Sequence, residues 1–224
     1  MHIPDGFIDI PTSTAFAVLS SAGVALSLKG AKSSLDEKTA PLAGLTATFI
    51  FAVQMLNFPV AAGTSGHLLG GALAAVLVGP YAASLALTVV LLMQGLLFAD
   101  GGLTAIGLNV FNMSIIGVWV GYFAFNLAKR ALPKKKASIA IAALIGGFIS
   151  VPAAAIGFVI EYAIGGTATF SVSAVASAMI GTHVLIGIGE GLITFFAVSA
   201  VMASRSDLVY GYKKEVNSLE TRSV

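Results

Sequence analysis

The first six residues, MHIPDG, place several nitrogen donors at one end of the chain. The α-amine of Met1 and the amide and imidazole of His2 lie close enough along the chain to form fused chelate rings on a single divalent metal ion. His67, in the stretch GTSGHLLGG, offers one more imidazole nitrogen. An all-nitrogen planar set suits nickel(II) or copper(II), because geometry and ligand type decide metal selectivity in proteins. The sequence therefore predicts a metal site made of Met1, His2 and His67.

The residues around this start support the prediction. Pro4 and Gly6 favour a turn rather than a helix directly after the two ligand residues. The chain start lacks the basic and then apolar pattern of a cleavable signal peptide, so we expect Met1 to remain the terminus. Metal binding must displace protons from the amine, whose free pKa is about 8, and from the His2 amide. Affinity for the metal should therefore rise with pH.

The composition indicates which elements must hold this site. Of the 224 residues, 57% are hydrophobic and only 10% are charged, which is typical of a membrane protein. Apolar runs of about 20 residues recur, the length that an α-helix needs to cross a bilayer. They lack the alternation of barrel strands. The chain has no cysteine, which excludes thiolate sites, and no basic surface for nucleic acid. We predict an all-α polytopic membrane protein.

Seven transmembrane helices are expected, over residues 10–29, 41–58, 67–79, 81–99, 103–128, 138–163 and 174–203. The stretch 67–79 is short for a full crossing, and Gly79 with Pro80 marks either a turn between two spans or a kink in one helix. We treat residues 1–204 as one transmembrane domain that includes a metal-binding segment, 1–9. Residues 205–224 are expected to form a cytoplasmic tail.

The positions of the charges predict the orientation of these helices. All twelve Lys and Arg residues fall within three clusters, at 29–38, 129–136 and 205–222. Cytoplasmic loops are enriched in Lys and Arg, so the N-terminus is predicted outside and the C-terminus in the cytoplasm. The outer side then carries only acidic charges, at Asp5, Asp9, Asp100 and Glu161. Such a surface raises the local concentration of cations.

Other polar residues lie within the apolar runs. His183 and Glu190 are seven residues apart and share one helix face, where they either form hydrogen bonds inside the bundle or orient and gate the site. Amides within the membrane either join helices or orient a metal-binding imidazole through its second nitrogen; they are Gln54, Asn57, Gln94, Asn109 and Asn112. Small residues at helical spacing allow close packing in lipid; they are Ala43 with Ala47, and Gly71 with Ala75 and Gly79.

Three stretches, MHIPDGF, NFPVAAGTSGHLLGGALAAVLVGP and GGLTAIGLNVFNM, resemble the CbiM/NikM family, the substrate-capture components of cobalt/nickel energy-coupling factor transporters. The resemblance implies a seven-helix protein of the prokaryotic plasma membrane that is not an enzyme. Its metal, Ni²⁺ or Co²⁺, would be held by the Met1 amine, the His2 amide and imidazole, and the His67 imidazole. A start that reads MHIPDG rather than MHIMEG favours nickel.

The same resemblance implies partner proteins. They are a transmembrane coupling subunit, two ATPase subunits and often a small accessory membrane protein. Ala43 and Ala47 would contact the coupling subunit. The chain itself has no phosphate-binding glycine loop of the Walker type, so ATP hydrolysis would fall to the partners.

Two other functions fit part of the sequence. Residues 63–66 read GTSG, and Ser65 with His183 resembles the dyad of rhomboid intramembrane proteases, in which a base activates the serine. This alternative assigns no role to MHIPDG or His67, and His183 is expected to lie away from the outer loop that holds Ser65. The other alternative is a scaffold or channel subunit, which would bind no metal.

Overall fold

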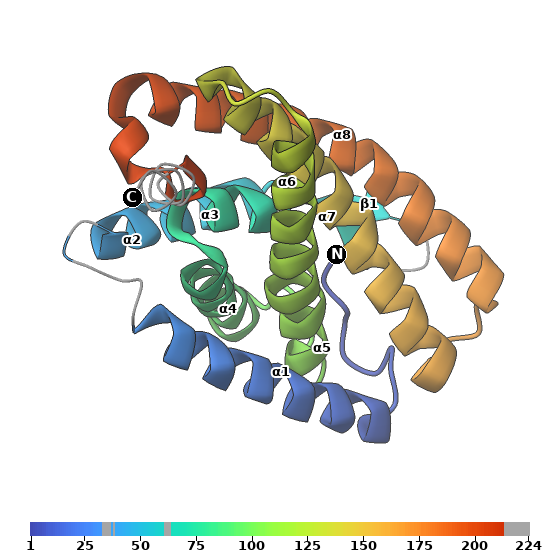
Figure 1. Cartoon of the computed structure of the whole chain (residues 1–224). Helices are drawn as coiled ribbons and strands as arrows, with labels where there is room; N and C mark the ends of the chain where they lie inside the picture. Colours follow the sequence, from blue (N-terminus) through green and yellow to red (C-terminus); the bar gives the residue numbers. More distant parts are fainter. Residues whose placement is uncertain (33–36, 38, 61–63, 213–224) are drawn as a thin grey trace.

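In the computed structural model, which describes residues 1–32, 37, 39–60 and 64–212, nearly all regular structure is helical (Figure 1). The elements are α1 (Ile10–Ala31), α2 (Thr39–Gln54), α3 (Gly71–Val78), α4 (Pro80–Leu97), α5 (Ile106–Asn109), the π-helix η2 (Val110–Gly117), α6 (Val118–Ala131), α7 (Lys136–Gly165), α8 (Val172–Arg205) and the 3₁₀ turn η3 (Ser206–Leu208). The prediction of a mainly helical fold is confirmed.

Within the described residues, five helices are long and apolar enough to cross a membrane. They are α1, α4, the continuous helix Ile106–Ala131, α7, and α8 extended through Leu208. The helix α2 has 16 residues and α3 only 8, so they rise about 24 Å and about 12 Å. Gly70, with φ of 78°, and Gly79, with φ of 88°, end α3 on its two sides. The count of seven crossings therefore remains a prediction.

The stretch between α2 and α3 differs from the expected helix end and flexible loop. It contains an antiparallel pair of strands, β1 (Phe58–Val60) and β2 (Thr64–Gly66), with Pro59 opposite Ser65. A residue before proline avoids the helical region, which favours the extended backbone of Phe58 in β1. Residues 61–63, which include Gly63 of the GTSG stretch, lie outside the described residues. The hairpin carries Ser65 and leads directly into His67.

The exposed faces of the helices are the apolar ones. In α1 the buried residues are small or polar, namely Thr12, Ser13, Ser20, Ser27 and Ala31, whereas Val18 is 64% and Leu26 is 66% exposed. Small and polar residues between helices with large apolar residues outside are the pattern of helices packed in lipid. Because such an apolar surface is unfavourable in water, the side chains support a membrane location independently of helix length.

The helix α3 is fully covered by other helices. All eight of its residues are buried, and a Cβ added at Gly71 would lie 3.1 Å from the backbone of Gly117 and Val118. A small residue at this position lets the two helices approach closely, as expected from the small-residue spacing. This short buried helix begins just after His67 and so fixes one side of the site.

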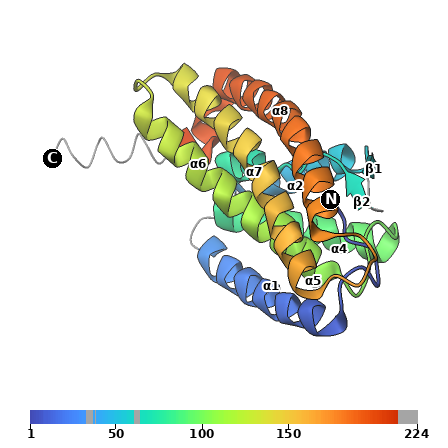
Figure 2. The same ribbon diagram turned by 90° about the vertical axis from the view of Figure 1, so that its right-hand side faces the viewer.

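The two ends of the bundle differ in charge. Figure 2 shows the N-terminus and the β-hairpin at one end, and the end of α6 and the start of α7 at the other. Asp5, Asp9 and Asp100 lie at the first end. The described basic residues lie at the second end, where Lys129 Nζ donates to the Gly211 carbonyl. Here the start of the expected tail packs on the bundle, since Val209 is fully buried.

Candidate metal centre

The first residues of the chain are threaded into the bundle rather than lying on its surface. Met1 is 1% exposed and Ile3 is fully buried. The backbone N–H of Ile3 donates to Asn109 Oδ1 at 2.8 Å, and the Ile3 carbonyl accepts from Gly102 N at 2.8 Å. Pairing of both backbone groups of Ile3 holds the preceding two residues in the protein interior.

The rest of the N-terminal segment is anchored at further points. The Asp5 carboxylate accepts hydrogen bonds from the Thr104 backbone N–H at 2.8 Å and from its hydroxyl at 2.6 Å. Gly6 has φ of 73°, which makes the turn that the sequence predicted. Phe7 packs on Tyr162 with ring centroids 5.2 Å apart. These contacts connect the segment to the α4–α5 loop and to α7.

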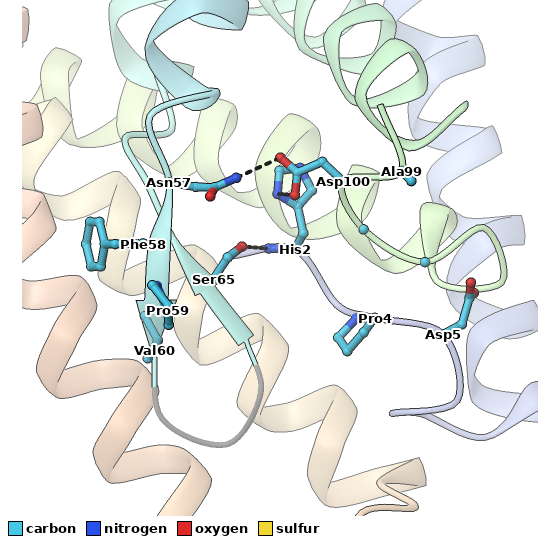
Figure 3. A pocket seen from close by; sticks show the side chains of 12 residues that line it. His2, Pro4, Asp5, Asn57, Phe58, Pro59, Val60, Ser65, Ala99 and Asp100 are labelled. Atoms are coloured by element: carbon cyan, nitrogen blue, oxygen red, sulfur yellow. Dashed lines mark hydrogen bonds and ion pairs between the residues drawn. The ribbon is translucent and has the colours of Figure 1, made fainter. Parts of the chain in front are cut away.

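The His2 ring is fixed by a partner at one nitrogen. Its Nε2 lies 3.2 Å from Gln94 Oε1, and when the ring is in the tautomer that donates to this oxygen, Nε2 carries the proton. In that tautomer Nδ1 is the unprotonated nitrogen; it is buried without a hydrogen-bond partner, and Asp100 Oδ1 lies 3.3 Å away (Figure 3). Nδ1 is also the ring nitrogen closer to the His2 backbone, so it is the one that can close a chelate ring with the His2 amide.

His67 has the complementary arrangement. Its Nδ1 donates to the Leu68 carbonyl at 2.9 Å, which leaves Nε2 as the unprotonated nitrogen. Nε2 is buried and has no hydrogen-bond partner, and the residue is 1% exposed. The centroids of the His2 and His67 rings are 4.6 Å apart, with 31° between their planes. Two neighbouring imidazoles thus each present one lone pair that no protein group uses.

The electrostatic environment keeps these nitrogens uncharged. Burial lowers the pKa of the Met1 amine well below its usual 8.0, although Asp100 opposes the shift. Burial, together with the nearby amine, lowers the pKa of His2 to about 3. Burial also holds the pKa of His67 well below 6.5. At neutral pH His2 is therefore neutral, and its 3.3 Å contact with Asp100 is not a pair of opposite charges.

A cavity of about 490 Å³ leads to His2 from the outside of the bundle. Figure 3 shows His2 between Ser65 of β2 and Asp100 of the α4–α5 loop. Ser65 Oγ lies 3.4 Å from the Met1 nitrogen and 3.3 Å from the His2 amide nitrogen. Asp100 Oδ2 accepts from Asn57 Nδ2 at 3.1 Å. A hydrated cation in this cavity would meet a carboxylate and then the backbone nitrogens of the chain start.

The structure brings the three sequence-predicted site residues, Met1, His2 and His67, into one cluster. In the described part of the chain, no group of three His, Asp or Glu side chains could hold a metal ion. Two of the four predicted donors are backbone nitrogens, so a side-chain cluster is not required here. The contacts of Ser65 and Asp100 with His2 could not be predicted from the sequence. The one available signal for Asp100 was a lone carboxylate beside glycines at the end of an apolar run.

The proposed serine–histidine dyad is not formed. His183 Nδ1 donates to the Met179 carbonyl at 2.7 Å, and Nε2 has no hydrogen-bond partner. Ser65 Oγ is engaged by the N-terminal segment instead. His183 nevertheless lies nearer to the site than expected, since it contributes to the lowered pKa of His67. The geometry places His183 behind the candidate centre rather than beside a nucleophile.

Known proteins resemble the chain over nearly its whole length. The family model described as CbiM, cobalt uptake substrate-specific transmembrane region, matches residues 2–208. A putative fused nickel transport protein NikMN of Archaeoglobus fulgidus is 43% identical, over 93% of this chain and 68% of that protein. The cobalt transport protein CbiM of Sorangium cellulosum is 34% identical, over 93% and 94% of the two chains. A crystal structure of a truncated transition metal transporter matches with a TM-score of 0.83 and 32% identity, over 91% of this chain and 99% of that one.

Proposed function

The chain belongs to the CbiM family of cobalt uptake transmembrane proteins, and from this premise we propose that it captures nickel(II) for an ATP-driven importer of the energy-coupling factor type. Cobalt(II) is the second candidate substrate, since relatives are described as cobalt or nickel transport proteins. In this proposal the ion is bound by the Met1 amine, the His2 amide nitrogen and Nδ1, and His67 Nε2.

One observation carries the proposal. His2 and His67 each give one ring nitrogen to a hydrogen bond and keep the other buried without a partner. A buried polar atom without a partner costs about 1–3 kcal/mol, so protein interiors rarely contain two such atoms side by side. A metal ion would use both lone pairs at once. The hydrogen bonds to Gln94 and Leu68 would keep the rings in the tautomers that metal binding requires.

The proposal extends to the assembly. The chain would cross the membrane seven times as a single domain over 1–204, with its N-terminus outside and the tail 205–224 in the cytoplasm of a prokaryotic cell. A transmembrane coupling subunit, two ATPase subunits and a small accessory membrane protein would complete the importer. Ala43 and Ala47, both half-buried on α2, would offer a close-packing surface to the coupling subunit.

Three forms of the purified protein test the site. The first is the native chain, the second has one residue added before Met1, and the third is His67→Ala. The added residue turns the amine into an amide without changing any side chain, so nickel binding should be lost. His67→Ala should leave a three-nitrogen chelate open to water and weaken binding, whereas His183→Ala should have a smaller effect.

The measurement is nickel content together with the absorption spectrum. Planar four-nitrogen nickel(II) is expected to be diamagnetic and yellow, whereas a water-rich octahedral ion is paramagnetic and pale. Full nickel occupancy in the extended protein would exclude the terminal amine as a ligand. Native protein without any bound metal after exposure to nickel would instead favour a scaffold or channel subunit.

A further inference from the structure

Glu190 of α8 reaches across to the backbone that follows His67. Its Oε2 accepts a hydrogen bond from the Leu69 N–H at 2.9 Å, and its Oε1 accepts one from the Gly70 N–H at 2.6 Å. The residue is 3% exposed. A buried carboxylate is costly unless hydrogen bonds compensate it, and these two N–H groups are its compensation.

The two N–H groups need this carboxylate because of where they lie. The helix α3 starts at Gly71 after Gly70, which has a left-handed backbone and no side chain to cap the helix. The N–H groups of Leu69 and Gly70 lie just before this helix and so have no acceptor within it, and a buried N–H group needs an acceptor from elsewhere. Here the acceptor comes from another helix, 120 residues further along the chain.

The same short segment is held from its other side as well. Gln54 Nε2 of α2 donates to the Leu69 carbonyl at 2.7 Å. Both backbone groups of Leu69 are thus bonded to side chains of different helices, and Leu69 is fully buried. The preceding carbonyl, that of Leu68, is the one that accepts from His67 Nδ1. The position of Leu69 therefore controls the acceptor that orients the His67 ring.

We propose that Glu190 is a positioning residue for metal capture: through the backbone of Leu69 and Gly70 it holds the Leu68 carbonyl, and so directs His67 Nε2 toward the ion. This inference rests on the proposed nickel function. It connects α8 to the centre by hydrogen bonds, although no side chain of α8 is a metal ligand in the proposal.

The test compares two substitutions of the same kind. In Glu190→Gln the amide group can accept at one position only, so one of the two N–H bonds is lost. In Glu161→Gln the same change is made at another buried carboxylate, which accepts from Asn112 Nδ2 at 2.6 Å and forms no hydrogen bond with residues 67–70 in the described part of the chain. Loss of groups that support metal ligands typically costs 10–100-fold in affinity. We expect about a tenfold weaker nickel affinity and a changed ligand-field absorption in Glu190→Gln, and native values in Glu161→Gln.

A double-mutant cycle shows whether Glu190 acts through His67. In the His67→Ala background, Glu190→Gln should cause no further loss of nickel affinity. An equal loss in both backgrounds would mean a general structural role and would overturn the proposal, as would native affinity and absorption in Glu190→Gln.

A second variant is available should Glu190→Gln fail to fold. In Glu190→Asp the shorter side chain moves the carboxylate away from the two N–H groups, so nickel affinity should be weakened in the same way. Native affinity in Glu190→Asp would overturn the proposal. If the native protein itself binds no nickel, the proposed function fails rather than this role of Glu190.

Discussion

At the candidate metal centre, the charges of individual residues add up to a value that suits a divalent ion. The His2 and His67 rings are neutral at neutral pH, and burial disfavours the charged form of the Met1 amine, because burial lowers the pKa of each group. Loss of the His2 amide proton would contribute one negative charge, and Asp100 next to His2 Nδ1 would contribute another. A buried charge is tolerated only when it is compensated, so a doubly charged cation would be balanced here.

This charge balance predicts that Asp100 strengthens nickel binding through its negative charge, in addition to attracting cations into the cavity. Asp100→Asn keeps an oxygen that can accept from Asn57 but removes the negative charge beside His2 Nδ1. We expect nickel affinity to fall at least about tenfold, which corresponds to ~1.4 kcal/mol. Asp5→Asn is the control, since Asp5 lines the same cavity but is bound to Thr104. Equal weakening by both substitutions, measured as nickel dissociation constants, would contradict a specific role for Asp100.

The lowered pKa values also predict how nickel binding depends on pH. Since the pKa of His2 is about 3 and that of His67 lies well below 6.5, the two rings do not bind protons at pH 7, and burial lowers the pKa of the Met1 amine well below 8.0. The His2 amide proton is then the main proton that must leave, so affinity should rise about tenfold per pH unit near neutrality, with about one proton released per ion. Calorimetry in buffers of different ionisation enthalpy measures this number.

A short peptide beginning with MHIPDG provides the comparison for that experiment. Its amine, with a pKa of about 8, and its imidazole, with a pKa of about 6.5, are protonated in acidic solution. Nickel must displace these protons as well, so the pH dependence of the peptide should be steeper below pH 6.5. The same slope for peptide and protein would contradict the idea that burial prepares the nitrogens for the metal.

Among the secondary-structure elements, the helices support the site but do not supply its predicted ligands. Met1 and His2 come from the N-terminal segment, His67 from the connection between β2 and α3, and Asp100 from the loop after α4. The helices contribute the polar groups that hold these segments, namely Gln94 of α4, Asn109 of α5 and Glu190 of α8. Such a division lets non-helical backbone lie deep in the bundle because side chains and neighbouring backbone give its polar groups partners.

The loop after α4 lies in close contact with the N-terminal segment at Gly102. A single methyl group added there is therefore expected to displace the segment. A Cβ added at Gly102 would clash with the Asp5 backbone nitrogen and lie 2.7 Å from the Pro4 carbonyl carbon. Overpacking of this kind costs about 1–3 kcal/mol. Gly102→Ala should therefore displace residues 1–5 and weaken nickel binding about tenfold or more, while far-UV circular dichroism shows intact helices.

The control for this substitution is Gly44→Ala in α2. A Cβ at Gly44 has no atom within 4 Å, and alanine favours helix over glycine, so stability should be unchanged or slightly higher. Nickel affinity should also equal that of the native protein. Native affinity in Gly102→Ala would show that the loop moves to accommodate the methyl group. The position of the N-terminal segment would then not depend on its close contact with Gly102.

For the whole molecule, the features that could be predicted from the sequence are those that depend on local chemistry or on long apolar runs. The helices from α4 to α8 follow from such runs, and the cluster of Met1, His2 and His67 follows from covalent adjacency and from one more imidazole. The hairpin was missed because its strands have three residues each, too few for a periodic pattern. The length of α3 was overestimated because an apolar stretch covered by protein looks the same as one covered by lipid. The partners of Glu190 are backbone N–H groups, which no residue type reveals.

The opposite charges at the two ends of the bundle give the last prediction, which concerns orientation. Since the chain contains no cysteine, single cysteines can be introduced at the exposed Lys135, between α6 and α7, and at the exposed Thr169, between α7 and α8. The 30-residue helix α7 separates the two positions, and basic loops remain in the cytoplasm. A membrane-impermeant thiol reagent should label Thr169→Cys in intact cells and Lys135→Cys only after permeabilisation. A reporter fused after Val224 should be cytoplasmic. The reverse labelling pattern would place the metal centre on the inner face, where it could not capture ions from outside the cell.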